Sequence, residues 1–346
     1  MKIAIHQKNN GFSSKWIHYC KENDIPFKKV NCYRNDIISE LSGCDGLMWH
    51  FHQSNPKDVL FARQLLYSLE SAGFHVFPDF HTCWHFDDKV GQKYLLEAKG
   101  APLVPSYVFY SRKEALDWID RIRFPIIFKL RTGAGSANVQ LIESKNDAKK
   151  CIYKAFGRGY RQYDPLSNLK ERWRKYRLGK TDMDDMIKAC ARFIYPTGHD
   201  RVAGREKGYV YFQEFIAGNE YDIRVNIIDG KASAVRRKVR PNDFRASGSG
   251  EIDYDMNNIP LEAVEIAFSL TEKLKFQSMA YDFVMDGNKP KIVELSYGFG
   301  FLPTDFKTGY WDSDLNFHEG AFNPFGWMVD GFVKQIQKKS KTIKTP

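Results

Sequence analysis

In the first part of the chain, short apolar runs typical of strands alternate with segments in which apolar positions recur at the spacing of a helix. Short apolar runs have the length of strands, at residues 2–7, 27–33, 45–51 and 74–78. Between them, two segments repeat apolar positions at helical spacing, residues 13–23 and 56–72. Strands that are apolar on both faces are typical of a parallel sheet covered by helices. Residues 1–86 are therefore predicted to form a small α/β domain.

Two histidines follow the third predicted strand of this domain. His50 and His52 lie at its C-terminal end, where open α/β sheets bind ligands. They are candidates for substrate contact, although two ordinary polar residues at a strand end remain the alternative.

Next comes a helical segment that begins at Asp87-Asp88-Lys89 and ends near Gly100, and then a strand–helix–strand pattern. The second strand, residues 125–131, is apolar except for Lys129 and Arg131. A lysine flanked by apolar residues needs an anion or a short path to water. The small residues at 132–138 directly after it, including Gly133, Gly135 and Ser136, could close backbone N–H groups over phosphate oxygens. A glycine loop alone is also compatible with an ordinary hairpin turn.

A polar strand is predicted at residues 220–228, after another strand at 209–216. Alternation places the polar residues on one face, Glu220, Asp222, Arg224 and Asn226. Such a face can form the floor of an active site, but a solvent-facing sheet has the same pattern.

Residues 281–296 read as a β-hairpin around the turn Asp286-Gly287-Asn288. Its first strand begins with Asp282 and its second ends with Glu294, so folding brings the two carboxylates to one edge. Neighbouring carboxylates repel unless a proton or a cation lies between them. Oxygen ligands of this kind suit Mg²⁺, whereas the alternative is a surface hairpin with solvated acids.

Composition narrows the class of protein. The 346 residues are 43% hydrophobic and 15% aromatic, which favours a folded enzyme-sized chain. We expect a cytoplasmic location, because the six cysteines are scattered and no apolar run could span a bilayer. The net charge of +10 favours anionic partners, and residues 158–207 contribute +6 of it (13 Lys or Arg minus 7 Asp or Glu). This basic insertion, about 157–207, is either a solvated face or a clamp on an anionic substrate.

In their order, these motifs resemble the ATP-grasp superfamily over residues 78–298, most closely the branch of glutathione synthetase and the ribosomal-protein glutamate ligases. The resemblance implies an α/β (α+β) ATP-grasp fold in three parts: residues 1–86, a central lid subdomain at 87–207, and a C-terminal antiparallel-sheet domain at 208–346. It also implies ATP and Mg²⁺, or Mn²⁺, as cofactors.

Roles for individual residues follow from the same resemblance. Phosphates would be contacted by Lys89 and Lys129, under a lid that contains Gly133, Gly135 and Ser136. The other residues implied to bind the nucleotide are Gln213, Glu214, Phe215, Ile216, Glu220 and Asp222. Metal ions would be held by Asp282, Glu294 and Ser296, the last replacing an asparagine that is usual in the family. Arg224 would lie near the transferred phosphoryl group and Arg245 near the acceptor.

The activity that the resemblance implies is ligation of a carboxylate to an amine through an acyl phosphate. The acid and the amine could be small or polymer-linked, and the basic surface favours anionic ones. Two other functions remain open: phosphoryl transfer to a hydroxyl, and less readily a nucleic-acid or polyanion binding module. The aromatic segment with Trp311, Phe317, Phe325 and Trp327 is expected to shape the acceptor site.

Overall fold

The computed structural model describes residues 1–9, 11–133, 138–161, 169, 173, 176, 183, 204–240, 243–246 and 250–342. The N-terminal domain is a parallel sheet in the order β2-β1-β3-β4, as the pattern predicts. Its strands are β1 (Ile3–His6), β2 (Phe27–Val30), β3 (Gly46–Met48) and β4 (His75–Phe77). Its helices are α1 (Phe12–Glu22), α2 (Ile37–Glu40), α3 (Pro56–Ser71) and α4 (Phe80–Cys83).

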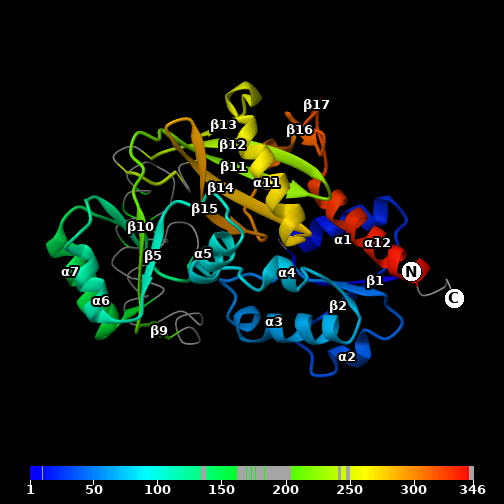
Figure 1. Cartoon of the computed structure of the whole chain (residues 1–346). Coiled ribbons are helices and arrows are strands. Elements are labelled where there is room, and N and C mark those ends of the chain that lie inside the picture. The colour runs from blue at the N-terminus through cyan, green and yellow to red at the C-terminus, as the bar shows by residue number, and fades with distance from the viewer. Residues whose placement is uncertain are drawn as a thin grey trace.

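A second, antiparallel sheet forms the central subdomain, at the far end of the molecule from the chain termini (Figure 1). Its order is β5-β10-β6-β7, from β5 (Ser106–Phe109), β6 (Ile126–Lys129), β7 (Gln140–Ile142) and β10 (Val210–Glu214). The accompanying elements are α5 (Lys89–Ala98), α6 (Arg112–Ile119), α7 (Lys145–Phe156) and the short pair β8 (Tyr160–Arg161) and β9 (Arg205–Glu206). β10 pairs with this sheet, although the predicted boundary at residue 208 assigns it to the C-terminal domain.

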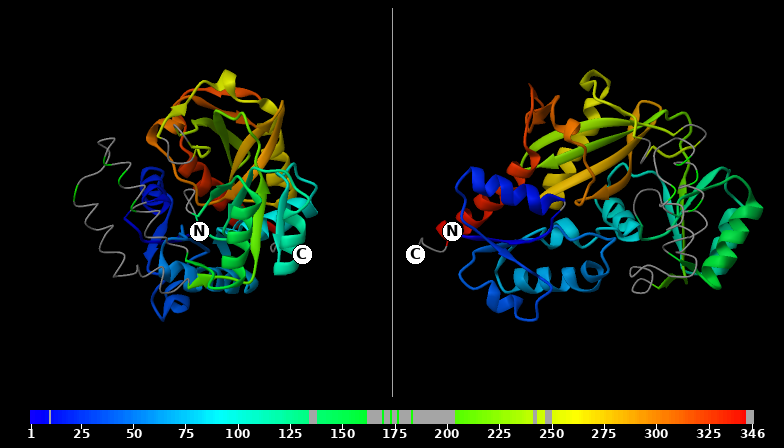
Figure 2. Two further views of the ribbon diagram at one scale, coloured as in Figure 1. Left: turned by 90° about the vertical axis from the view of Figure 1, so that its left-hand side faces the viewer. Right: turned by 180° about the vertical axis from the view of Figure 1, so that it is seen from behind.

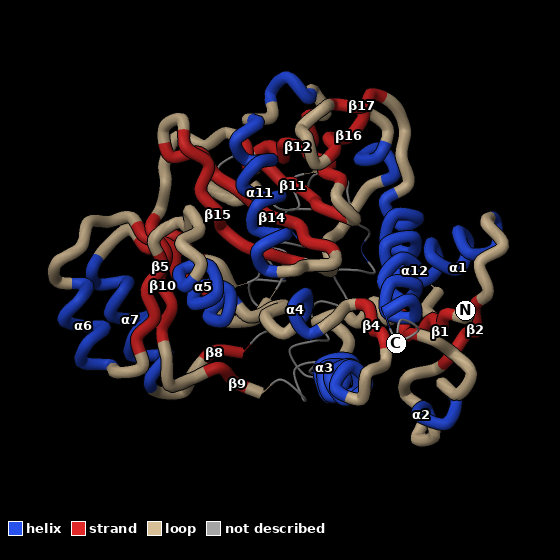
Figure 3. Tube along the Cα trace, turned by 45° about the vertical axis from the view of Figure 1, so that its right-hand side comes forward, coloured by secondary structure: helices blue, strands red, loops and turns tan. Residues whose placement is uncertain are grey.

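The third sheet has the order β15-β14-β11-β12-β16-β17, with β13 paired to β12. Its strands are β11 (Tyr221–Ile228), β12 (Lys231–Lys238), β13 (Ile252–Asp253), β14 (Ser278–Asp286), β15 (Lys289–Ser296), β16 (Gly309–Asp312) and β17 (Phe317–Glu319). Helix α11 (Leu261–Leu274) packs on one face of this sheet, as Figures 1 and 3 show. Two 3₁₀ turns lie beside it, η1 (Met256–Asn258) and η2 (Pro303–Phe306).

Part of the aromatic segment is structural core, whereas Phe317 is exposed. The segment continues into α12 (Pro324–Thr342), which runs alongside α1 of the N-terminal domain in both views of Figure 2. Phe325 and Phe332 pack with Phe12 and Trp16 in one apolar cluster, and Trp311 is also buried. Burying each large side chain of this kind contributes about 1.5–3 kcal/mol to stability. Because the cluster contains side chains of both α12 and α1, its burial stabilises the contact between the C-terminal and N-terminal domains.

No helix in the described part of the chain is both long and apolar enough to cross a membrane.

Candidate functional site

A cavity of about 1110 Å³ lies where the central sheet, the third sheet and one loop of the N-terminal domain meet. Residues from all three parts of the chain form its wall. Its lining includes most of the site residues predicted from the sequence, namely Lys89, Lys129, Gly133, Gln213, Glu214, Phe215, Ile216, Asp222, Arg224, Arg245, Asp282, Glu294 and Ser296.

One part of the cavity is an apolar slot between two sheets. Ile127 and Leu141 come from the central sheet, and Val284 and Val293 from the β14–β15 hairpin. The segment 213–216 runs along this slot where β10 ends. A flat apolar ring with polar edges fits such a slot, because its faces meet side chains and its edge meets backbone groups.

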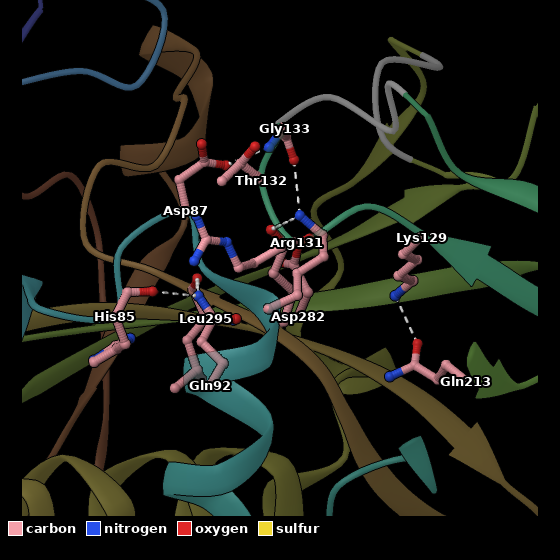
Figure 4. A network of polar contacts seen from close by, with 12 residues as sticks. His85, Asp87, Gln92, Lys129, Arg131, Thr132, Gly133, Gln213, Asp282 and Leu295 are labelled. Carbon is pink, nitrogen blue, oxygen red and sulfur yellow. Dashed lines mark hydrogen bonds and ion pairs between the residues drawn. The ribbon is translucent and has the colours of Figure 1, made fainter. Parts of the chain in front are cut away.

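Lys129 occupies the position that the sequence predicts, at the end of a buried strand. Its side chain is 5% exposed, and its Nζ donates to Gln213 Oε1 at 2.6 Å (Figure 4). Gln213 is held in turn, because its Nε2 donates to Ser106 Oγ at 3.0 Å. Burial lowers the pKa of Lys129 to about 8, from an ordinary 10.5. An anion beside this lysine would therefore be bound more strongly than at the surface.

A second buried lysine, Lys89, lies at the start of α5. Asp88 caps this helix by accepting the Gly91 N–H at 2.9 Å. Lys89 Nζ donates to the Gly133 carbonyl at 2.8 Å and lies 3.2 Å from Glu294 Oε1. Burial opposes its charge, but the carboxylates of Glu294 and Asp87 outweigh this and raise the pKa of Lys89.

The segment after β6 is tied to the start of α5. Gly133 N–H donates to Asp87 Oδ1 at 2.7 Å, and Lys89 N–H donates to the Arg131 carbonyl at 2.9 Å. Burial raises the pKa of Asp87 to about 6. Glu206 accepts from the backbone N–H and the hydroxyl of Thr132. These contacts fix the entrance of the glycine-rich loop beside both lysines.

Strand pairing brings charged residues of four strands together in two neighbouring cross-strand rows. Asp222 is the cross-strand partner of Arg237, Arg224 that of Asp282, and Asp282 that of Glu294. The predicted meeting of the two hairpin carboxylates is therefore confirmed.

Two arginines neutralise Asp282. Arg224 pairs with it in bidentate fashion, at 2.8 and 2.9 Å, and Arg237 Nη2 lies 3.0 Å from Asp282 Oδ2. Burial would raise the pKa of Asp282, but these two guanidinium groups hold it well below its usual range. Arg237 also binds Asp222, with its Nε 2.7 Å from Asp222 Oδ1.

Among the predicted site residues that the structure describes, one does not line the cavity, and two more lie outside the described ranges. Glu220 precedes β11, is exposed and is absent from the cavity wall. Gly135 and Ser136 lie outside the described residues, as does most of the basic insertion. Arg245 does line the cavity, with its guanidinium bound to Asp243 at 2.6 to 3.0 Å.

Two positioning residues were not singled out from the sequence. Arg237 has the position described above, and only its place in a basic stretch after β11 gave a signal. Gln92 on α5 exchanges two hydrogen bonds with the backbone of Leu295, its Oε1 accepting at 3.0 Å and its Nε2 donating at 2.8 Å. Gln92 also donates to the His85 carbonyl at 3.2 Å (Figure 4). It thereby fixes β15 next to Glu294, a contact across 203 positions that no sequence pattern indicates.

The residues present suit a hard divalent cation that is bound jointly with a substrate. Within the described ranges, no three His, Cys, Asp or Glu side chains come together as a complete protein cage. Mg²⁺ usually needs only one or two carboxylates, with water and substrate phosphates completing its shell. Asp282 and Glu294 supply two carboxylates and Ser296 a hydroxyl on the same hairpin.

Comparison with known proteins identifies the fold. No protein-family model and no curated protein sequence matches the chain. Among solved structures, it is similar to D-alanine–D-alanine ligase from Bacillus anthracis complexed with ATP, at TM-score 0.58 and 13% identity, with 99% of this chain and 98% of that chain covered. The ATP-grasp ligase PsnB complexed with minimal precursor, Mg and ADP matches at TM-score 0.54 and 13% identity, with 97% and 98% covered. A RimK domain ATP-grasp protein from Sphaerobacter thermophilus matches at TM-score 0.53 and 13% identity, with 87% and 92% covered. The chain therefore has the ATP-grasp fold that its motifs resemble.

Proposed function

We propose that this ATP-grasp chain is an ATP- and Mg²⁺-dependent ligase that joins a carboxylate to an amine through an acyl phosphate. The observation that supports this most is the make-up of one cavity, in which an apolar slot, two buried lysines and a pair of neighbouring carboxylates lie together. Structures with the same fold include ligases complexed with ATP, or with Mg and ADP.

In this proposal, adenine occupies the apolar slot, with its edge against residues 213–216. Lys89 and Lys129 then contact the phosphates, since both are buried cations on the cavity wall. Asp282, Glu294 and Ser296 hold Mg²⁺. A carboxylate has about four lone-pair sites, so Asp282 can keep its arginines and still bind a metal. The bound metal would neutralise charge on the phosphates.

The arginine pair has a separate role. Phosphoryl transfer depends mainly on positioning and on stabilising charge on the equatorial oxygens. Arg224 and Arg237 are pre-positioned for this by Asp282 and Asp222, so little reorganisation is needed during the reaction. The product of transfer to a carboxylate is an acyl phosphate, whose phosphate an amine can displace. Water must be kept from this intermediate, and Gly133, at the entrance of the glycine-rich loop, lies on the cavity wall.

Trapping with hydroxylamine tests this proposal. The chain is incubated with ATP, Mg²⁺ and a library of carboxylic acids, and products are analysed by mass spectrometry. A ligase of this type releases ADP and phosphate and converts its acid to a hydroxamate. A phosphorylated product that survives hydroxylamine would instead indicate a phosphotransferase. Failure of the protein to bind any nucleotide would refute the proposal.

A further inference from the structure

The N-terminal sheet has a topological switch point that borders the main cavity. β1 lies between β2 and β3, so the chain leaves β1 towards one side of the sheet and later returns on the other. Ligands of parallel α/β sheets bind beyond the carboxyl ends of the strands at such a point. Here those ends carry Lys8, after β1, and residues 50–53, after β3. His52 and Gln53 line the cavity.

The loop after β3 is held in one conformation by a buried carboxylate. Asp58 on α3 is 2% exposed and accepts the backbone N–H of His52 at 2.8 Å. It also accepts the Tyr33 hydroxyl at 2.6 Å. Asp58 thus binds groups of the protein, the His52 N–H and the Tyr33 hydroxyl, while His52 and Gln53 line the cavity.

Hydrogen bonds define which ring nitrogen of each histidine is a donor. His52 Nδ1 accepts the Ser54 N–H at 3.2 Å, so the proton of the neutral ring is on Nε2. His50 Nδ1 accepts the Phe12 N–H at 3.3 Å, so its proton is likewise on Nε2. Both rings stay neutral near pH 7, because burial lowers their pKa values, to about 3 for His50, and the charge of Lys8 adds to this.

Two polar atoms of this loop have no hydrogen-bond partner among the described residues. His50 Nε2 and Gln53 Oε1 are both shielded from solvent. His50 is 6% exposed and is stacked on Phe12 with a centroid separation of 3.9 Å. An unpartnered buried polar group costs about 1–3 kcal/mol, which a ligand that supplies the partner would recover. Gln53 Oε1 can accept an N–H or O–H, whereas His52 Nε2–H and the Lys8 ammonium are donors that bind an oxygen.

We propose that Lys8, His52 and Gln53 bind a second anionic group of the acid substrate, namely a carboxylate with an N–H group beside it. This inference rests on the proposed function, in which the first carboxylate is activated near Asp282 and Glu294. The substrate class is then an N-acylated acidic amino acid, or a peptide that contains one. Lys8 supplies the charge, His52 Nε2–H binds a carboxylate oxygen, and Gln53 Oε1 accepts the N–H.

Calorimetric titration of the whole chain, without nucleotide, tests the subsite. The probes are N-acetyl-L-glutamate, 4-acetamidobutyrate, which lacks one carboxylate, and glutarate, which lacks the N–H. We expect N-acetyl-L-glutamate to bind at least about tenfold more tightly than 4-acetamidobutyrate and several-fold more tightly than glutarate. Equal affinity for the three probes, or no binding of any of them, would overturn the proposal.

Variants assign the binding to these residues. Lys8→Met and His52→Leu should each weaken N-acetyl-L-glutamate about tenfold, while His52→Gln, which keeps an N–H near the same place, should lose less than about threefold. The control is Lys29→Met, which removes an exposed lysine from β2 in the same domain and should leave affinity unchanged. Unchanged affinity in Lys8→Met would refute the proposal even if His52→Leu failed to fold. Nucleotide binding is titrated separately, so its absence would count against the proposed function alone.

Discussion

The buried charge of Lys129 makes nucleotide binding dependent on pH in a calculable way. Its pKa in the free protein is about 8, against an ordinary 10.5, because burial disfavours the charged form. The lysine is therefore about nine-tenths charged at pH 7 and about one-tenth charged at pH 9. A bound phosphate stabilises the charged form and restores the pKa towards 10.5. At a pH between these two pKa values, binding of the nucleotide must be accompanied by uptake of a proton. The affinity must therefore fall as the pH rises through 8.

With a bound-state pKa near 10.5, this linkage predicts about tenfold weaker binding of MgADP at pH 9 than at pH 7. Calorimetry in two buffers with different ionisation enthalpies measures both the affinity and the proton uptake near pH 8. The Lys129→Met variant should bind MgADP more weakly at pH 7. It should also lack the pH dependence that Lys129 causes, whereas any dependence due to titration of the nucleotide itself should be the same in the variant and the unmodified protein. Identical pH profiles for the two proteins would refute the assignment of Lys129 to the phosphates.

Three further predictions follow from the same contacts. Glu294→Gln should reduce Mg²⁺-dependent ATP turnover more than about 100-fold with an unchanged thermal midpoint. The control Glu97→Gln, which changes an exposed carboxylate paired with Lys93, should not reduce turnover, and equal rates in both variants and the unmodified protein would contradict the metal role. Arg237→Met should lower the free energy of unfolding in urea by about 3–5 kcal/mol, because it removes a cation shared by Asp222 and Asp282, whose side chains are only 17% and 18% exposed. Arg236→Met, at a pair that is more exposed, should cost about 1 kcal/mol or less, and equal losses in the two variants would show that burial of the pair is unimportant. Gly46→Ala should lower the free energy of unfolding by about 1–3 kcal/mol, since its Cβ would lie 2.6 Å from Phe332 Cζ on α12. Adding Phe332→Leu should recover part of this loss. A Gly46→Ala protein of unchanged stability would show that β3 and α12 are not in close contact.

The elements that carry the site were predictable where local patterns are strong. The turn at 286–288 and the flanking alternation predict the hairpin, and its register makes Asp282 and Glu294 direct neighbours. An apolar run around one lysine likewise predicts the buried position of Lys129. These signals lie within single strands or one hairpin.

Contacts between distant elements could not be predicted in this way. The pairing of Arg237 with Asp222 and Asp282 depends on β11 lying between β12 and β14, which one sequence does not specify. The link from Gln92 to Leu295 joins two domains. The aromatic segment looks like a ligand-binding tail from composition, but the apolar faces of α12 and α1 bury part of it. Glu220 fits the alternation of β11, yet it falls just outside the strand and is exposed.

The location of the nucleotide and the metal is the centre of this account, and one crystal structure tests it most directly. The chain is crystallised with Mn²⁺ and a non-hydrolysable ATP analogue, and anomalous diffraction locates the metal. The account predicts adenine between β10 and the β14–β15 hairpin, phosphates beside Lys89 and Lys129, and an anomalous peak at the oxygens of Asp282 and Glu294. A nucleotide bound elsewhere, or a metal peak away from both carboxylates, would contradict it.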